Sequence, residues 1–298
     1  MLHYIRGFCC VMVLSQLTLW GQSEVTLSVD NDLYFASDFY YSSGLFLQKG
    51  KKIAIDSTTS IHQFSQWKIG QLIYTPRKRY ATTFDQIDYP FSGYLFLRYS
   101  REKGIKNHWG FRYSAELGIS GDASLAKPVQ NLYHELVLGL PALSWTAQMP
   151  QQLHIGFYAD YYYSIQLTNN LSLIPDIHAA ASTHQSRLSG RLGLVLGSTA
   201  KMPFDFNALW NTKKGSGVYL GWRQQYVMHD FALEGSLFND AALLTVPSNR
   251  IRNFLEVGAT IHNAKWQART TYFSSSRDTP LQRDPRHLYL NISVTRFF

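Results

Sequence analysis

The C-terminal stretch LYLNISVTRFF, residues 288–298, decides the fold class because its side chains alternate in character almost residue by residue. The apolar set is Leu288, Leu290, Ile292 and Val294, and the alternate set is Tyr289, Asn291, Ser293 and Thr295. A period of two is typical of a β-strand with one apolar face. The same period recurs through most of the chain.

About twelve segments carry this alternation, an even number, as expected for bacterial single-chain barrels. They cover residues 24–30, 43–49, 65–75, 92–100, 108–119, 151–166, 170–181, 186–197, 217–228, 251–262, 265–274 and 287–298. Their lengths cluster near the ~9 to 11 residues that cross a bilayer at a tilt. The sequence therefore predicts an all-β fold, a transmembrane antiparallel up-and-down β-barrel with a short helix in an outer loop.

Composition supports a membrane setting. Charged residues make up 16% of the chain, below the roughly 25% of soluble domains, and aromatic residues reach 15%. No stretch after residue 21 approaches the ~20 consecutive apolar residues of a membrane helix. The final Phe297 and Phe298 resemble the aromatic end of outer-membrane barrel strands, so we expect a bacterial outer-membrane location.

The N-terminus predicts a secretory signal peptide at residues 1–21, followed by a barrel domain at residues 22–298. Arg6 precedes an apolar run from Phe8 to Trp20, the order found in signal peptides. A short buried segment of a soluble protein is the alternative. Both cysteines, Cys9 and Cys10, lie in this segment, so the mature chain would be free of cysteine and suited to an oxidising compartment.

Net charge favours an anionic partner. The formal charge is +8, or +7 without Arg6, and the basic residues are scattered rather than arranged along a helix. With no nucleic-acid motif in the sequence, we expect a membrane partner and no nucleic acid. Simple solubility explains the charge equally well. We expect a monomer.

Three connections differ from the strands in their sequence pattern. Val129 to Leu143 has leucines at helical spacing before Pro141 and predicts a short helix. Residues 231–250 predict an extended hairpin beyond the membrane. Residues 198–216 predict a long connection without visible chemistry.

Strand direction brings three polar loops to one rim, the outer rim if both termini face the periplasm. These loops follow the first, third and fifth strands. They contribute Asp30, Asn31, Asp32 and Ser42; Tyr74, Arg77 and Lys78; and Gln130 and His134. A barrel without a binding or catalytic role would not require polar residues to gather at one rim, so the pattern favours a functional site there.

A proton-transfer site is the chemistry that this rim best supports. A neutral imidazole at His134 can take a proton from water or a hydroxyl, and Gln130 lies one helical turn before it. Asn31 and backbone donors could stabilise an oxyanion. A structural histidine is the competing interpretation. Ser42 could be a nucleophile, although no G-x-S-x-G context surrounds it.

Two further groups of side chains have binding and structural interpretations. Asp30 and Asp32 offer the oxygen ligands that calcium prefers, but D-N-D is also ordinary turn chemistry. The basic run 77–79 could contact lipid phosphates or be a solvated loop.

Three motifs together resemble the outer-membrane lipid A 3'-O-deacylase family. They are VDNDLYFASDFYYSSG at 29–44, GQLIYTP at 70–76 and GISGDASLAKPVQNLYH at 118–134. Their order and spacing make the resemblance specific, and strand patterning extends it over nearly the whole mature chain. The resemblance implies a twelve-stranded barrel, a divalent cation such as calcium, and hydrolysis of the ester that holds the 3'-linked acyl chains of lipid A in lipopolysaccharide.

Position by position, the resemblance implies that His134 activates water, while Asn31 and Asp32 bind the cation or stabilise the oxyanion. Gln130 would orient His134 or substrate, and Ser42 stands where the family usually has threonine. Asp30 stands where the family often has glutamate and would be a further metal ligand. Lys78 is the nearest counterpart of the family's functional lysine, and with Arg77 and Tyr74 it would bind substrate. Gly121-Asp122 replaces the family's glycine-proline.

Two other functions remain open from the sequence. An outer-membrane phospholipase would use Ser42 and His134. A non-enzymatic pore or surface-binding barrel would fit the basic charge and the predicted hairpin at 231–250.

Overall fold

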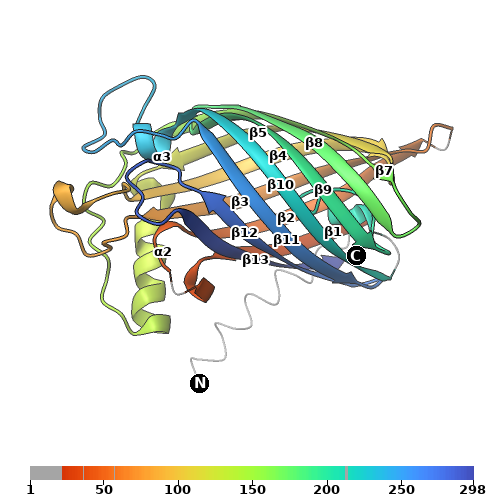
Figure 1. Ribbon diagram of the computed structural model, residues 1–298, viewed down its shortest axis with the longest axis horizontal. Coiled ribbons are helices and arrows are strands. Elements are labelled where there is room, and N and C mark those ends of the chain that lie inside the picture. The colour runs from red at the N-terminus through yellow and green to blue at the C-terminus, as the bar shows by residue number, and fades with distance from the viewer. Residues whose placement is uncertain (1–21, 36, 57, 212–213) are drawn as a thin grey trace.

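The computed structural model describes residues 22–35, 37–56, 58–211 and 214–298. The predicted signal peptide lies outside these residues. The described chain forms a closed antiparallel β-barrel with loops and a short helix gathered at the rim opposite the C-terminus (Figure 1). The sheet closes where β6 pairs with β8, and β1 pairs with both β2 and the C-terminal β13.

Twelve strands make the wall, as the alternation predicts, because β7 is a two-residue continuation of β6 along the same neighbour. The bounds are β1 Ser23–Asn31, β2 Tyr40–Asp56, β3 Ile61–Thr75, β4 Ser92–Ile105, β5 Trp109–Ser120, β6 Leu153–Tyr163, β7 Ile165–Gln166, β8 Leu171–Ser182, β9 Gln185–Gly197, β10 Gly215–Asp230, β11 Ile251–His262, β12 Trp266–Ser276 and β13 Arg286–Phe297.

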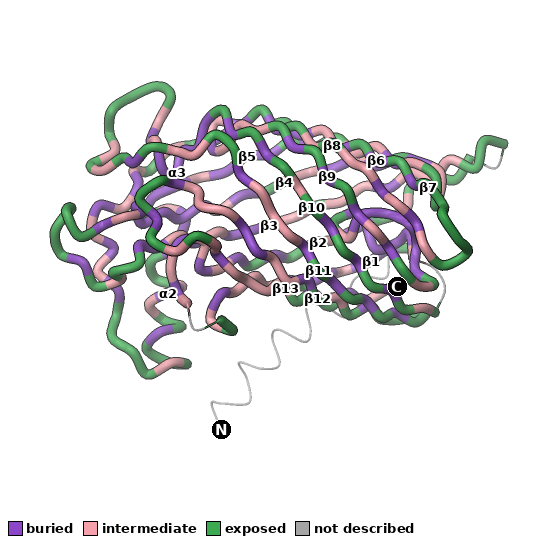
Figure 2. Tube along the Cα trace, viewed as in Figure 1, coloured by how far each residue is buried: buried purple, intermediate pink, exposed green. Residues whose placement is uncertain are grey.

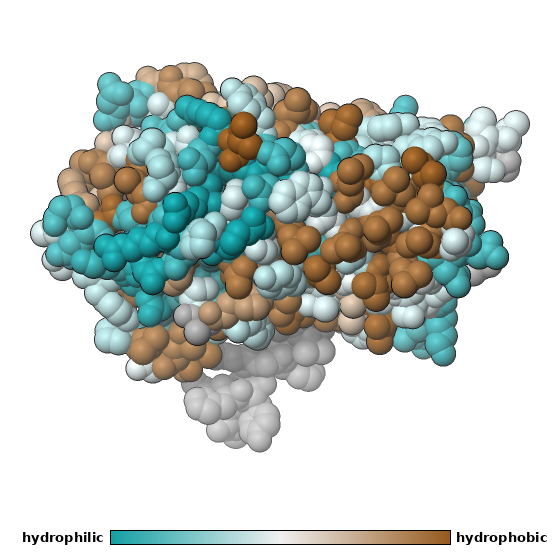
Figure 3. Space-filling view, in the orientation of Figure 1, coloured by the Kyte–Doolittle hydropathy of each residue, from teal (hydrophilic) through white to brown (hydrophobic). Residues whose placement is uncertain are grey.

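The wall has one apolar and one polar face. Along β1, Leu27 is exposed on the outer side while Thr26 and Ser28 are buried towards the lumen, and Figure 2 shows the same alternation on other strands. Figure 3 shows apolar side chains covering much of the barrel half nearer the C-terminus. Among the described residues no helix is long and apolar enough to cross a bilayer.

The predicted helix at 129–143 is present but begins and ends earlier. It consists of α2, Ala126–Tyr133, and a π-helical turn, η4, His134–Leu138. Pro128 is tolerated in the first turn, and Gly139 ends the helix with φ of 64°, a backbone conformation that glycine adopts without strain. The remaining short helices are η1 Leu33–Phe35, η2 Phe84–Gln86, η3 Asp122–Ser124, η5 Ala208–Trp210 and α3 Phe231–Glu234.

The predicted hairpin at 231–250 is wrong. Residues 231–234 form the single turn α3, and residues 235–250 contain no strand. Leu233 and Val246 instead pack with Tyr40 and Tyr89 in a buried cluster. Their apolar character reflects packing at the barrel mouth, so the alternation in this segment does not mark strand pairing.

In the predicted connection at 198–216, residues 198–211 fold back into the barrel at the end where the C-terminus lies. Phe206 packs edge-on against Tyr162 of β6, and Trp210 packs against Phe64 of β3. Asp205 accepts hydrogen bonds from Arg112 through its carbonyl oxygen (2.7 Å) and forms an ion pair with Arg191 (2.8 Å). This segment therefore fills that end of the lumen as a plug.

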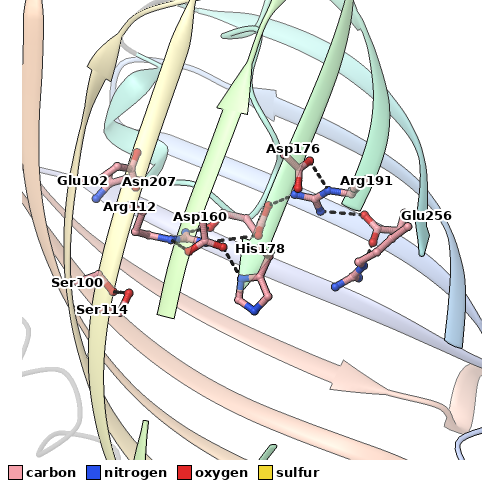
Figure 4. A network of polar contacts seen from close by, with 12 residues as sticks. Ser100, Glu102, Arg112, Ser114, Asp160, Asp176, His178, Arg191, Asn207 and Glu256 are labelled. Atoms are coloured by element: carbon pink, nitrogen blue, oxygen red, sulfur yellow. Dashed lines mark hydrogen bonds and ion pairs between the residues drawn. The ribbon is translucent and has the colours of Figure 1, made fainter. Parts of the chain in front are cut away.

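The plug is held by a network of ion pairs that crosses the lumen (Figure 4). Arg112 also pairs with Asp160, at 3.0 Å, and Arg191 also pairs with Asp176 (2.7 Å) and Glu256 (3.1 Å). Each arginine therefore joins the plug to carboxylates on the barrel wall.

We expect the plugged barrel to conduct ions poorly. In planar bilayers the protein should give no steady open-channel conductance. A variant in which residues 200–210 are replaced by a short glycine-serine turn should conduct, because the plug no longer blocks the lumen. Equal steady conductance of both proteins would contradict this prediction.

Candidate functional site

The helix α2 lies against the outer side of the barrel wall. Ile73 of β3 points to the same lipid-facing side of the strand as the exposed Ile69. It is nevertheless buried, because Ala126 packs with it. On β4, a Cβ at Gly93 would lie 2.3 Å from the Ala126 Cβ, so glycine permits this close approach. Gln71 donates a hydrogen bond to the Ser124 carbonyl oxygen at 2.7 Å, which fixes the start of the helix.

His134 is buried between this helix and the loop that joins β1 to β2. Its Nε2 lies 3.0 Å from Oδ2 of Asp38. Asp38 also forms an ion pair with Arg79, from the loop after β3. The His134 Nδ1 has no hydrogen-bond partner among the described residues. An Nε2–H that donates to Asp38 leaves the Nδ1 lone pair available to accept a proton.

Gln130 lies one helical turn before His134, and it contacts Ser42 of β2. The Gln130 amide nitrogen is 3.5 Å from Ser42 Oγ, and the serine hydroxyl donates to the Ile73 carbonyl oxygen at 3.4 Å. Both side chains are buried, and Gln130 Oε1 has no partner among the described residues. A β-bulge at Tyr41 and Ser43 shifts the register where Ser42 enters β2.

Asp32 contributes a buried carboxylate to the same loop. Its Oδ2 accepts a hydrogen bond from the Phe39 backbone N–H at 3.0 Å, whereas Oδ1 has no partner in the described residues. Burial, and to a smaller extent the nearby Asp38 charge, raises the pKa of Asp32 to about 8. Asn31 precedes it and uses Oδ1 to accept from the Leu33 N–H at 2.7 Å.

Two of the predicted site residues lie on the lumen side of the wall instead. Asp30 accepts hydrogen bonds from Tyr41 (2.6 Å) and Asn291 (2.5 Å). Tyr74 stacks on Tyr89 with ring centroids 5.9 Å apart and lines the same lumen cavity of about 210 Å³ as Asp30. The wall therefore separates these two side chains from the buried pair of His134 and Asp38.

The two predicted basic residues lie on the exposed loop after β3. Arg77 forms an ion pair with Asp284 and lies over the Phe39 ring at 5.2 Å. Lys78 is exposed on the same loop. Arg79, the third residue of this run, is the one that reaches the site through Asp38.

The donor set fits a divalent cation in part. The free, buried Oδ1 of Asp32 suits calcium, which takes six to eight oxygen ligands in proteins. Asp30 does not fit, because Tyr41 and Asn291 engage it on the other side of the wall. Among the described residues no group of three histidine, cysteine or acidic side chains could hold a metal ion. Backbone carbonyls, water or substrate would have to complete a site at Asp32.

Sequence reasoning missed Asp38 as a partner of His134. Asp38 belongs to the polar cluster between the first two strands, but carboxylates in such a loop are common turn residues. Its contact with His134 spans about a hundred residues of chain and depends on loop conformation. A histidine that needs an orienting acid was the available signal.

Comparison with known proteins decides the family. A family model described as outer membrane protein LpxR matches residues 7–298. The chain belongs to the LpxR family. LpxR proteins are lipid A 3'-O-deacylases, a class of ester hydrolase, and reside in the outer membrane. No curated protein matches the chain.

Solved structures are similar to this chain to different extents. LpxR from Salmonella typhimurium superposes with a TM-score of 0.76 at 18% identity, covering 92% of this chain and 100% of that one. The β-domain of the Bordetella autotransporter BrkA gives a TM-score of 0.48 at 10% identity, covering 93% and 97%. The KdgM porin gives 0.42 at 8% identity, covering 92% and 99%. At these identities the similarity to LpxR from Salmonella typhimurium shows the fold alone.

Proposed function

We propose that this LpxR-family protein hydrolyses the 3'-linked acyl ester of lipid A, with His134 as the general base that activates water. The observation that carries the proposal is the buried pair of His134 and Asp38, held between α2 and the outer side of the wall. A substrate whose acyl chains lie in the surrounding leaflet would reach such a site without entering the lumen.

The proton transfers follow from the His134 contacts. Asp38 holds the Nε2–H, so Nδ1 takes a proton from water as the oxygen attacks the ester carbonyl carbon. The tetrahedral intermediate then expels the sugar alkoxide, which receives the proton from Nδ1. The products are a free fatty acid and a sugar hydroxyl. Amide N–H groups of Asn31 and Gln130 are candidate donors to the oxyanion.

We propose that Asp32 holds calcium, which would supply positive charge near the developing oxyanion. Support comes from the chemistry of its free Oδ1: a buried carboxylate is costly in its charged form unless an opposite charge lies nearby. The Asp32 charge would be retained in the cation-bound protein.

A phospholipase that uses Ser42 as its nucleophile has weaker support. The Ser42 hydroxyl contacts Gln130 and a backbone carbonyl, whereas the partner of His134 is Asp38. A nucleophilic serine ordinarily hydrogen-bonds to its base, although free enzymes can show looser geometry. We further propose that the protein acts as a monomer, since one chain closes the barrel.

Mass spectrometry of lipid A tests this function. Expression of the full chain in a bacterium with intact lipid A should release the 3'-linked acyl chains and leave glycerophospholipids unchanged. Unaltered lipid A in cells that contain the folded barrel would overturn the proposal, and released phospholipid fatty acids would favour the phospholipase.

Calcium dependence is tested on the same reaction in isolated membranes. A calcium chelator should stop deacylation, and excess calcium should restore it, because the Asp32 site would refill. Asp32→Asn keeps the side-chain shape and removes the charge, so it should weaken the response to calcium. Full activity in the chelator would contradict the calcium proposal while leaving the role of His134 intact.

A further inference from the structure

The helix formed by α2 and η4 carries three rows of side chains with different surroundings. Residues four apart lie on one face of a helix. The first row, Ala126, Gln130 and His134, is buried against the wall. The two exposed rows differ in chemistry: one holds Lys127 and Glu135, the other Leu132 and Leu136, with Tyr133 and Val137 beside them.

The apolar row is unusually open for a soluble setting. Leu136 is 75% exposed, Val137 64% and Leu132 57%. Exposed apolar side chains that gather in one row mark a binding surface far more often than scattered ones do. Water on this row would be unfavourable, so another apolar phase is expected to cover it.

The position of the helix indicates which apolar phase covers the row. The helix lies on the outer side of β3 and β4, and in Figure 1 α2 projects beyond the barrel contour across the direction of the strands. Figure 3 shows an apolar patch in the same region. The strands that the helix crosses continue towards the C-terminal end of the barrel with exposed Leu47 of β2, Ile69 of β3 and Leu97 of β4, which belong to the lipid-facing surface. The apolar row is thus continuous with the membrane-facing band.

The charged residues of the helix also favour a membrane interface as its surroundings. Lys127 and Glu135 on the second exposed row suit water and headgroups, and the apolar row suits acyl chains. An exposed helix that is polar on one side and apolar on the other lies in the plane of a membrane interface. A protein partner would not require the apolar row to join the lipid-facing wall.

We propose that α2 and η4 form a ledge seated in the outer leaflet, with the apolar row among the acyl chains. Because His134 lies on the wall-facing row of this helix, the ledge sets the depth of the imidazole in the leaflet. The second statement rests on the proposed function; the seating of the helix does not.

Spin labels on neighbouring residues test the seating. The described residues contain no cysteine, so the full chain with Cys9→Ser and Cys10→Ser accepts a single label. A nitroxide at Leu136→Cys, in vesicles that contain lipopolysaccharide, should be relaxed by oxygen rather than by a water-soluble nickel chelate. The matched label at Glu135→Cys should show the reverse. Equal access of the nickel chelate to both labels would overturn the proposal, as would label-to-label broadening at Leu136 that reveals a second copy.

An activity measurement tests the depth. The double variant Leu132→Ser, Leu136→Ser should lose at least about tenfold more activity on lipid A in vesicles than on lipid A dispersed in detergent. The control is Leu243→Ser, 70% exposed on the loop after α3, which should retain both activities. Equal losses in vesicles and detergent would overturn the depth role. If the wild type is inactive on both substrates, the proposed function fails, and the spin labels still decide the seating.

Discussion

His134→Ala is expected to lower 3'-deacylation by about 10²–10⁴-fold, the usual contribution of a general base. The substitution removes the ring nitrogen that accepts the proton from water, and nothing else in the buried row can replace it at that position. Alanine is a strong helix former, so α2 and η4 should persist. The readout is the rate of fatty acid release from lipid A, measured by mass spectrometry.

Glu135→Ala is the matched control for His134→Ala. Glu135 is the next residue of the same π-helical turn, and it is exposed. Its variant should retain wild-type activity. Barrel formation in both variants is checked by circular dichroism. A folded His134→Ala protein that keeps full activity would exclude the general-base role.

Asp38→Asn is expected to lower kcat by about ten- to a hundredfold and leave KM nearly unchanged. A hydrogen bond to a charged group contributes about 1.5–3 kcal/mol, and 1.4 kcal/mol corresponds to a factor of ten in rate. Asparagine preserves the shape of the side chain but loses the charge that holds the Nε2–H of His134. Steady-state kinetics on detergent-dispersed lipid A separate kcat from KM.

Arg79→Met separates this effect from general damage to the loop. It removes the other ion pair of Asp38 and leaves the contact with His134 in place. Because Arg79 is partly exposed, that ion pair is worth at most about 1 kcal/mol, so the loss should stay within about fivefold. Equal losses in Asp38→Asn and Arg79→Met would indicate that Asp38 only stabilises the loop.

The wall of the barrel could be predicted from sequence because each strand must present one face to lipid and one to the lumen. That constraint makes apolar and polar residues alternate in segments such as 287–298. Because consecutive strands run in opposite directions, the loops after the first, third and fifth strands lie at one rim. Loop conformation carries no such period. The contact of Asp38 with His134 and the buried turn at 231–234 were therefore missed.

The alternation along each strand also predicts which side chains face the lipid and which face the lumen. Asp30 has the parity of Thr26 and Ser28, opposite to the lipid-facing Leu27, so alternation alone assigns it to the lumen. The prediction assigned residues to the site only by the rim at which their loops lie. It therefore placed Asp30 and Tyr74 beside His134, although the barrel wall separates them. Ser42 could not be assigned in this way, because the bulge at Tyr41 and Ser43 resets the alternation.

The plug at the C-terminal end of the lumen has a consequence for traffic through the outer membrane. A deacylase whose substrate and fatty acid product both travel sideways within one leaflet needs no passage along its axis. The lumen is then free to be filled with ion pairs such as those of Arg191 and Arg112. Lipid A can be remodelled in this way while the permeability barrier of the cell stays sealed.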